Sequence, residues 1–169
     1  MKVRIPLRPR RVDGIDCPFP IVRLRVRDRY GMLAELEFRV DSQADFTSIP
    51  VPMARRDAIP FSEAQQRTVI GLVGQTTAYR DRVHVVIAGR EHDWPCDFLT
   101  QPPPREPDRL SNDLLPVLGR AGFLDEYAIT VDSGYLIVTR IGPIRRWLWR
   151  CLHALWMACG TVHPEKQPL

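Results

Sequence analysis

Asp41 is the residue of this sequence best placed to do chemistry, because it stands where an apolar strand ends. Leu36, Phe38 and Val40 alternate with charged residues up to that point, which is typical of a half-buried strand. Small and polar residues follow at once: Ser42, Gln43, Ala44 and Asp45. A carboxylate in such a loop can serve as an acid or a base in catalysis, but Asp also caps many ordinary turns.

A second segment bears on the same loop. Residues 115–120 read Leu-Pro-Val-Leu-Gly-Arg, so two large apolar side chains directly precede Gly119 and Arg120. A glycine in this position also suits a turn or the start of a helix, and each segment by itself is a weak signal. Their order along the chain, inside a pattern of short strands, makes the pair more specific than either part.

Together the two segments resemble the two sequence hallmarks of retropepsin-like aspartic proteases. Those hallmarks are an Asp-Thr/Ser-Gly-Ala active-site loop and a later hydrophobic-hydrophobic-Gly-Arg segment. The resemblance covers about residues 20 to 141. Ser42 matches the family's Thr or Ser, whose hydroxyl bonds across the dimer, and Ala44 matches the small residue of the loop. Asp45 corresponds to a neighbour that often helps to position the substrate backbone.

The resemblance implies a homodimeric endopeptidase that acts on a peptide or protein substrate. Asp41 would be the catalytic carboxylate, and each subunit would supply one, because the chain has one such loop. Two carboxylates about 3 Å apart share a proton, so that one is the acid and the other the base for a water molecule. Activity is therefore expected to be strongest at acidic pH and to be lost in Asp41→Asn. No metal and no cofactor are expected.

The resemblance also implies two supporting elements. One is a segment that braces the active-site loop: Val117, Leu118, Gly119 and Arg120. The other is a flap that closes over the substrate, with glycines that permit its bend: Gly71, Leu72, Val73 and Gly74.

Gln43 departs from the family pattern, because the family has glycine at this position. Glycine lets the backbone approach the carboxylates and adopt conformations that are costly for other residues. A glutamine there is expected to crowd the catalytic water or to strain the loop, although its backbone N–H can still donate to Asp41. The alternative function is therefore a catalytically inactive protein of the same fold that binds extended peptides or a partner protein.

The strand pattern predicts an all-β fold, either a closed barrel or a folded sheet. Alternating apolar residues predict hairpins over 22–40, 67–89 and 128–138, and a further strand over 94–99. In the first hairpin, arginines of one strand are expected to face glutamates of the other. A short helix is expected from Gly119 to Asp125.

The two ends of the chain differ from the central domain of residues 20–141. Residues 1–19 carry three prolines among arginines, with Pro20 directly after them, and are expected to form an extended arm rather than a packed element. Residues 142–169 contain an amphipathic helical pattern over 144–159. We expect this helix to pack on its own domain or to seal a dimer, with peripheral membrane contact as the alternative. It is too short and too charged to span a bilayer, which takes roughly 20 apolar residues.

Composition excludes several other functions. The net charge of +4 and the isoelectric point near 9.1 are basic, but the arginines do not cluster as nucleic-acid binding requires. The four cysteines form no C-x-x-C pair, so free thiols are expected rather than a zinc site. No secretory signal is recognised at the N-terminus, and a cytoplasmic location is expected, with membrane association through 144–159 as the alternative.

Overall fold

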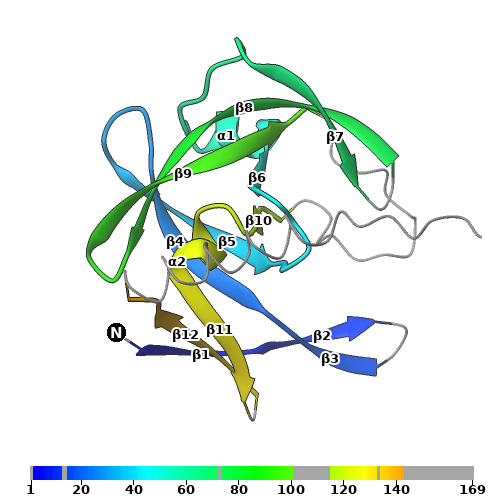
Figure 1. Ribbon diagram of the computed structural model, residues 1–169, viewed down its shortest axis with the longest axis vertical. Helices are drawn as coiled ribbons and strands as arrows, with labels where there is room; N and C mark the ends of the chain where they lie inside the picture. Colours follow the sequence, from blue (N-terminus) through cyan, green and yellow to red (C-terminus); the bar gives the residue numbers. More distant parts are fainter. Residues whose placement is uncertain (1, 13–14, 72–73, 101–114, 133, 143–169) are drawn as a thin grey trace, which may run out of the picture.

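The computed structural model describes residues 2–12, 15–71, 74–100, 115–132 and 134–142 of the 169-residue chain. Within these ranges the protein is mostly β-strand, with two short helices (Figure 1). The all-β class predicted from the strand pattern is thereby confirmed. The elements are β1 (Lys2–Pro6), β2 (Arg8–Val12), β3 (Ile15–Phe19), β4 (Ile21–Arg27), β5 (Leu33–Val40), β6 (Thr47–Pro50), α1 (Val51–Arg56), β7 (Gln66–Gly71), β8 (Gly74–Ile87), β9 (Arg90–Leu99), β10 (Val117–Leu118), α2 (Phe123–Glu126), β11 (Tyr127–Asp132) and β12 (Tyr135–Arg140).

A seven-stranded sheet forms the main body, in the order β4-β5-β10-β6-β9-β8-β7. β4 also pairs with β8, where Arg25 lies opposite Val86 and Val26 opposite Val85. β4, the first strand in this order, therefore also pairs with β8, close to the C-terminal end of β8. β10 has only two residues, yet it lies between β5 and β6 and joins the strands on either side of the Asp41 loop.

The hairpin of β4 and β5 shows how the alternating sequence builds the core. Its inward side chains are buried: Val22, Leu24, Val26, Leu36, Phe38 and Val40. On the outer face, Arg23 lies opposite Glu37, and its Nη2 is 2.8 Å from Glu37 Oε1. Glu35 lies 3.3 Å from Nε of the same arginine. The predicted pairing of arginines with glutamates is confirmed. Water screens such exposed pairs and they add little to stability, so apolar burial is the larger stabilising effect.

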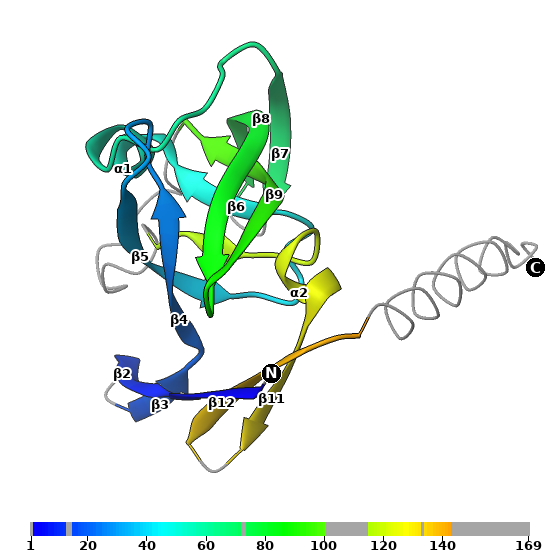
Figure 2. The same cartoon turned by 90° about the vertical axis from the view of Figure 1, so that its left-hand side faces the viewer.

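The N-terminal segment is extended, but Lys2–Pro6 does not stand apart from the fold. It forms β1 and pairs with β12 in a three-stranded sheet of order β1-β12-β11. Figure 2 shows this sheet below the seven-stranded one. β2 and β3 pair with each other as a separate ribbon. The expectation of an unpacked arm is therefore wrong for Lys2–Pro6. Its proline ends the strand, where a missing N–H costs little.

A polar network connects β9 with α2 and with the start of β11, among buried apolar side chains. Tyr127 and His92 are joined through the phenol oxygen and Nε2 at 2.9 Å, and His92 Nδ1 lies 2.9 Å from Glu126. The Trp94 indole N–H donates to the same carboxylate at 3.4 Å. Burial raises the pKa of the Tyr127 hydroxyl, with the charge of Glu126 as a second cause. The polar groups of this network are thus paired with one another, which offsets the cost of burying them.

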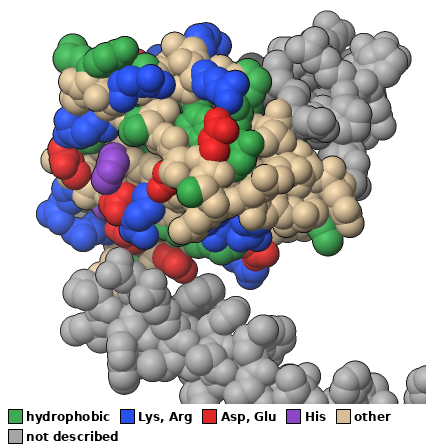
Figure 3. Space-filling view, turned by 90° about the horizontal axis from the view of Figure 1, so that it is seen from above, with side chains coloured by type: hydrophobic (Ala, Val, Ile, Leu, Met, Phe, Trp, Pro, Cys, Tyr) green, Lys and Arg blue, Asp and Glu red, His purple; other side chains and the backbone are tan. Residues whose placement is uncertain are grey.

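Three predictions from the sequence concern the surface charge, the cysteines and a membrane-spanning helix. Figure 3 shows basic and acidic side chains interspersed over one face of the molecule. Cys96 is a free, fully buried thiol, and burial raises its pKa. Over the part of the chain that the structure describes, no helix has the length and hydrophobicity needed to cross a membrane. The amphipathic helix predicted over 144–159 lies outside the described residues.

Candidate active site

Asp41 lies directly after β5, where β10 runs parallel to the end of that strand. Val117 lies opposite Arg39, and Leu118 lies opposite Val40. The Asp41 N–H donates to the Leu118 carbonyl at 3.1 Å, one step beyond the regular pairing. The hydrogen-bonded β10 therefore fixes the backbone at Asp41. The sequence prediction that Asp41 lies in a loop next to Leu118 is confirmed.

The Asp41 carboxylate is held by its own loop and remains partly accessible. Its Oδ1 accepts a hydrogen bond from the Gln43 N–H at 2.9 Å, and its carbonyl accepts one from the Ala44 N–H at 3.3 Å. The side chain is 35% exposed, and Arg39 Nη2 lies 3.8 Å from Oδ2. A turn that orients one carboxylate oxygen while solvent reaches the group suits a catalytic carboxylate. It equally suits an Asp that caps a turn.

Gln43 occupies an ordinary backbone conformation. Among the described residues other than glycine, only Ala58 and Ala88 have positive φ angles. The loop therefore does not place Gln43 in the left-handed region that favours glycine, and the strain expected there from the sequence is absent. The backbone N–H donates to Asp41, as anticipated, and the side chain is exposed. Any effect of Gln43 on catalysis must come from the bulk or polarity of its side chain.

Gly119 and Arg120 hold the second half of the loop. A Cβ atom added at Gly119 would lie 2.4 Å from the carbonyl carbon and oxygen of Phe46 and 2.8 Å from the Ala44 oxygen. The Arg120 N–H donates to the Ala44 carbonyl at 2.8 Å, and its guanidinium forms an ion pair with Asp45. Only a residue without a side chain permits this approach.

The helix after this segment is shorter than the sequence indicated. The predicted helix ran from Gly119 to Asp125, whereas α2 spans Phe123–Glu126. The residues before it are bonded to the loop: the Ala121 N–H donates to the Asp45 carbonyl at 2.8 Å. The carbonyl groups of Gly119 and Arg120 accept hydrogen bonds from N–H groups of α2. The Arg120 carbonyl accepts from the Asp125 N–H at 3.0 Å. Gly122, directly before α2, has a φ angle of 97°, which a right-handed helix cannot include, so the helix begins only after it.

A hairpin matches the segment predicted as a flap. β7 and β8 pair antiparallel up to Gly71 opposite Gly74, so the bend falls between these two glycines. Leu72 and Val73, the predicted tip, lie outside the described residues. Ile70, just before the bend, is 75% exposed.

Three residues near the loop were not singled out by sequence reasoning. They are Phe46, which follows Asp45, together with Arg80 on β8 and Asp97 on β9. Arg80 stacks on the Phe46 ring and forms two hydrogen bonds with the buried Asp97. An acidic residue between Cys96 and Phe98, inside an apolar strand, is the one sequence signal that pointed to a buried ion pair.

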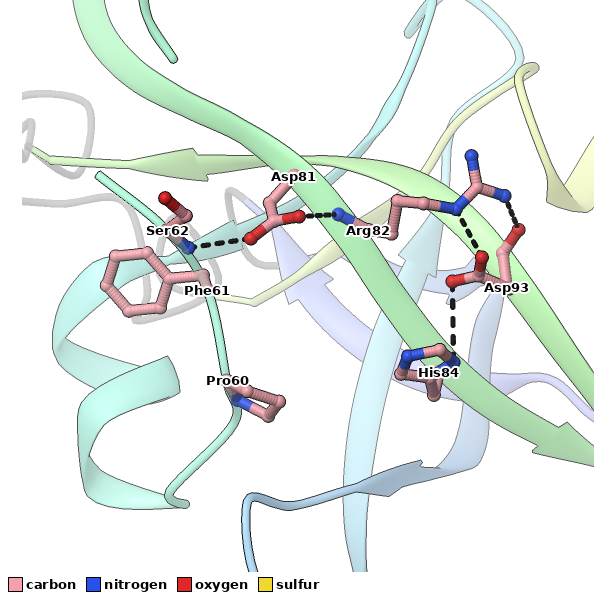
Figure 4. A pocket seen from close by; sticks show the side chains of 7 residues that line it. All are labelled: Pro60, Phe61, Ser62, Asp81, Arg82, His84 and Asp93. Carbon is pink, nitrogen blue, oxygen red and sulfur yellow. Dashed lines mark hydrogen bonds and ion pairs between the residues drawn. The ribbon is translucent and has the colours of Figure 1, made fainter. Parts of the chain in front are cut away.

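A hollow among the described residues lies away from this loop. It has a volume of about 370 Å³ and lies beside β8 and β9 (Figure 4). Its carboxylates are already occupied: Asp81 accepts from the Ser62 N–H at 2.6 Å, and Asp93 pairs with Arg82 and with His84. None of its lining residues belongs to the loop 41–46. We therefore place the candidate site at Asp41, where the geometry supports chemistry, and not at this hollow.

Comparisons with solved structures find the same architecture. A retropepsin-like aspartic protease from Rickettsia conorii is 17% identical, with a TM-score of 0.50, over 81% of this chain and 98% of that one. EIAV protease in complex with the inhibitor HBY-793 is 17% identical, with a TM-score of 0.46, over 60% of this chain and 82% of that one. No family model matches the sequence, and no curated protein does. The match to the Rickettsia conorii protein, which extends over nearly the whole of that protein, shows that the chain has the fold of the retropepsin-like aspartic proteases.

Proposed function

We propose that the protein is a homodimeric aspartic endopeptidase in which the two Asp41 carboxylates activate a water molecule. The observation that carries the proposal is the position of Asp41: it ends β5, is bonded to β10 through Leu118, and is partly accessible in a retropepsin-like fold. Gly119 and Arg120 secure the loop from the other side. Fold alone does not define activity, and the argument therefore rests on this loop.

The proposed chemistry needs two copies of the chain. One Asp41 carboxylate, in its ionised form, accepts a proton from water while the water oxygen attacks the carbonyl carbon of the scissile peptide. The protonated Asp41 of the second copy first donates to the carbonyl oxygen. Collapse of the tetrahedral intermediate re-forms a carbonyl and returns a hydroxyl proton to the second Asp41. The C–N bond breaks as the first Asp41 passes the proton it took from water to the leaving nitrogen. An isologous two-fold interface brings the same residue of both subunits to one place.

The dependence of rate on protein concentration tests this proposal. A mixed peptide library is incubated with the full chain over a wide range of protein concentrations, and new termini are identified by mass spectrometry. We expect the activity per subunit to rise with concentration and to level off where sedimentation shows dimers. Cleavage per subunit that is the same in monomer and dimer would refute a shared site.

The pH profile gives a second expected result. The pair is competent only with one proton between its two carboxylates, so activity falls at low pH, where both are protonated, and at higher pH, where both are ionised. We expect a bell-shaped kcat/KM profile with its maximum below pH 7. A profile that rises steadily through neutral pH would point to a different catalytic group.

A non-catalytic protein of the same fold is the second candidate, and one contact favours it. Arg39 gives Asp41 a partner of opposite charge within its own chain, at 3.8 Å. This ion pair gives Asp41 a structural role within one chain, so its presence at the strand end does not require a second subunit. In that case the cleft would bind an extended peptide or a partner protein without cleaving it. Peptide binding without cleavage by a folded dimer would support this alternative.

Replacing Gln43 by Gly is expected to raise kcat by about two- to tenfold, corresponding to relief of about 0.4–1.4 kcal/mol of crowding beside the carboxylates. Because Gln43 has no left-handed backbone to relieve, Gln43→Ala should raise kcat equally. The two variants should differ in stability, since glycine costs about 0.5–1 kcal/mol more through backbone entropy. Steady-state kinetics and urea unfolding measure both effects. A slower enzyme in either variant would mean that the amide takes part in the mechanism.

A further inference from the structure

Phe46 anchors a group of charged residues immediately after the active-site loop. The Arg80 guanidinium carbon lies 3.4 Å from the centre of the Phe46 ring, and that of Arg67 lies 5.4 Å from it. Arg67 is on β7 and Arg80 is on β8, so both strands of the predicted flap hairpin reach the same ring. Cation–π contacts of this kind hold a guanidinium in a defined orientation.

The charges in this group do not balance. Asp97 is the acidic member, and its side chain is 5% exposed. Arg80 satisfies both of its oxygens, with Nε 2.6 Å from Oδ1 and Nη2 2.9 Å from Oδ2. Arg67 comes only within 3.9 Å of Oδ1, and its side chain is 40% exposed. One carboxylate thus faces two guanidiniums, and the excess positive charge lies on the accessible one.

The neighbouring carboxylate does not neutralise Arg67. Asp45, next to Phe46 in the loop, forms its ion pair with Arg120. Among the described residues, Asp97 is the one carboxylate that the Arg67 guanidinium approaches, at 3.9 Å. The guanidinium lies over Phe46, next to the active-site loop, with donors available to a further anion. A peptide bound beside Asp41 and under the hairpin would run past this position.

We propose that Arg67 is a specificity-determining residue that binds an aspartate or glutamate side chain of the bound peptide. The inference rests on the proposed function for the position of the peptide, although it needs binding only and not cleavage. A guanidinium forms paired hydrogen bonds with a carboxylate, and these are stronger than neutral ones. Stacking on Phe46 orients Arg67 before the ligand arrives, which lowers the entropy cost of binding.

Affinity selection from a peptide library tests the proposal. The full-length Asp41→Asn protein is immobilised, so that no peptide is cleaved, and a degenerate library of acetylated, amidated peptides is applied at low salt. The blocked ends ensure that side chains supply all carboxylates. We expect Asp and Glu to be enriched over Asn and Gln about three- to tenfold at one position, a range between an exposed ion pair and a charge-assisted bidentate one. The enrichment should fall at high salt.

Three second-site variants separate Arg67 from general electrostatics. Arg67→Gln should abolish the acidic preference, and Arg67→Glu should turn it into a preference for Lys and Arg. Arg55→Gln, at an exposed arginine on α1 that pairs with Glu63, should leave it unchanged. Equal enrichment in Arg67→Gln, no acidic preference, or no retained peptide would each overturn the inference. Acidic enrichment together with no cleavage by the unmodified chain would instead refute the proposed peptidase and leave the role of Arg67 standing.

Discussion

Replacing Asp41 by Asn is expected to abolish peptide cleavage and to leave the fold intact. In the unmodified protein the Gln43 N–H donates to the Asp41 side chain at 2.9 Å. The amide keeps an oxygen that can accept this hydrogen bond, so the loop retains its shape. It cannot accept a proton from water, and loss of one acid–base group typically lowers the rate by about 10²–10⁴-fold. The contact with Arg39 is partly exposed and long, so its loss should change stability by less than about 1 kcal/mol. Turnover of a cleaved library peptide and urea unfolding check the two parts.

Mixtures of the two proteins make the test specific for a shared site. If subunits exchange freely, an equal mixture contains about one quarter wild-type homodimers, and these alone carry two ionisable residues at position 41. The rate should then fall to about a quarter of that of the same total amount of wild-type protein. A rate of one half would show that each subunit works alone. Undiminished cleavage by pure Asp41→Asn would show that another group does the chemistry.

The elements around Asp41 could be predicted because their signals are local. Alternating residues determine which side chains of β4 and β5 face inward, and a one-residue shift would expose the whole apolar set. The approach of residues 117–119 to the loop was inferred from the resemblance, and the hydrogen bond from Asp41 to Leu118 confirms it. Both predictions depended on patterns of a few adjacent residues.

The features that sequence reasoning missed depend on contacts between distant residues. Lys2 lies opposite Thr139, and the prolines of the N-terminal segment had argued against a packed strand there. Phe46 and Arg80 meet because β8 crosses beside the loop, which no local pattern records. The Gln43 backbone was misjudged for a related reason: residue type shows which conformations are costly, but the surrounding loop determines which one is adopted.

Gly119→Ala is expected to destabilise the protein by about 2–4 kcal/mol. The added methyl group would lie 2.4 Å from the Phe46 carbonyl atoms, and these belong to the backbone, so no side-chain rotation relieves the contact. Overpacking in a tight region costs about 1–3 kcal/mol. Movement of the loop would also weaken the hydrogen bond from the Arg120 N–H to the Ala44 carbonyl, at about 0.5–1.5 kcal/mol. Urea unfolding followed by tryptophan fluorescence measures the difference in free energy.

Gly142→Ala is the matched control, because a Cβ at Gly142 would meet nothing within 4 Å. It should alter stability by less than about 0.5 kcal/mol, as other surface substitutions do. A Gly119→Ala protein as stable as this control would show that the loop moves away at little cost, so that residues 117–120 do not fix it. If Gly119→Ala is destabilised but folded, its kcat should fall more than its KM rises, since the displaced loop carries Asp41 and the chemistry depends on the placement of two carboxylates. An unchanged kcat in that folded variant would mean that Gly119 serves stability alone, and that the bracing of Asp41 comes from Leu118.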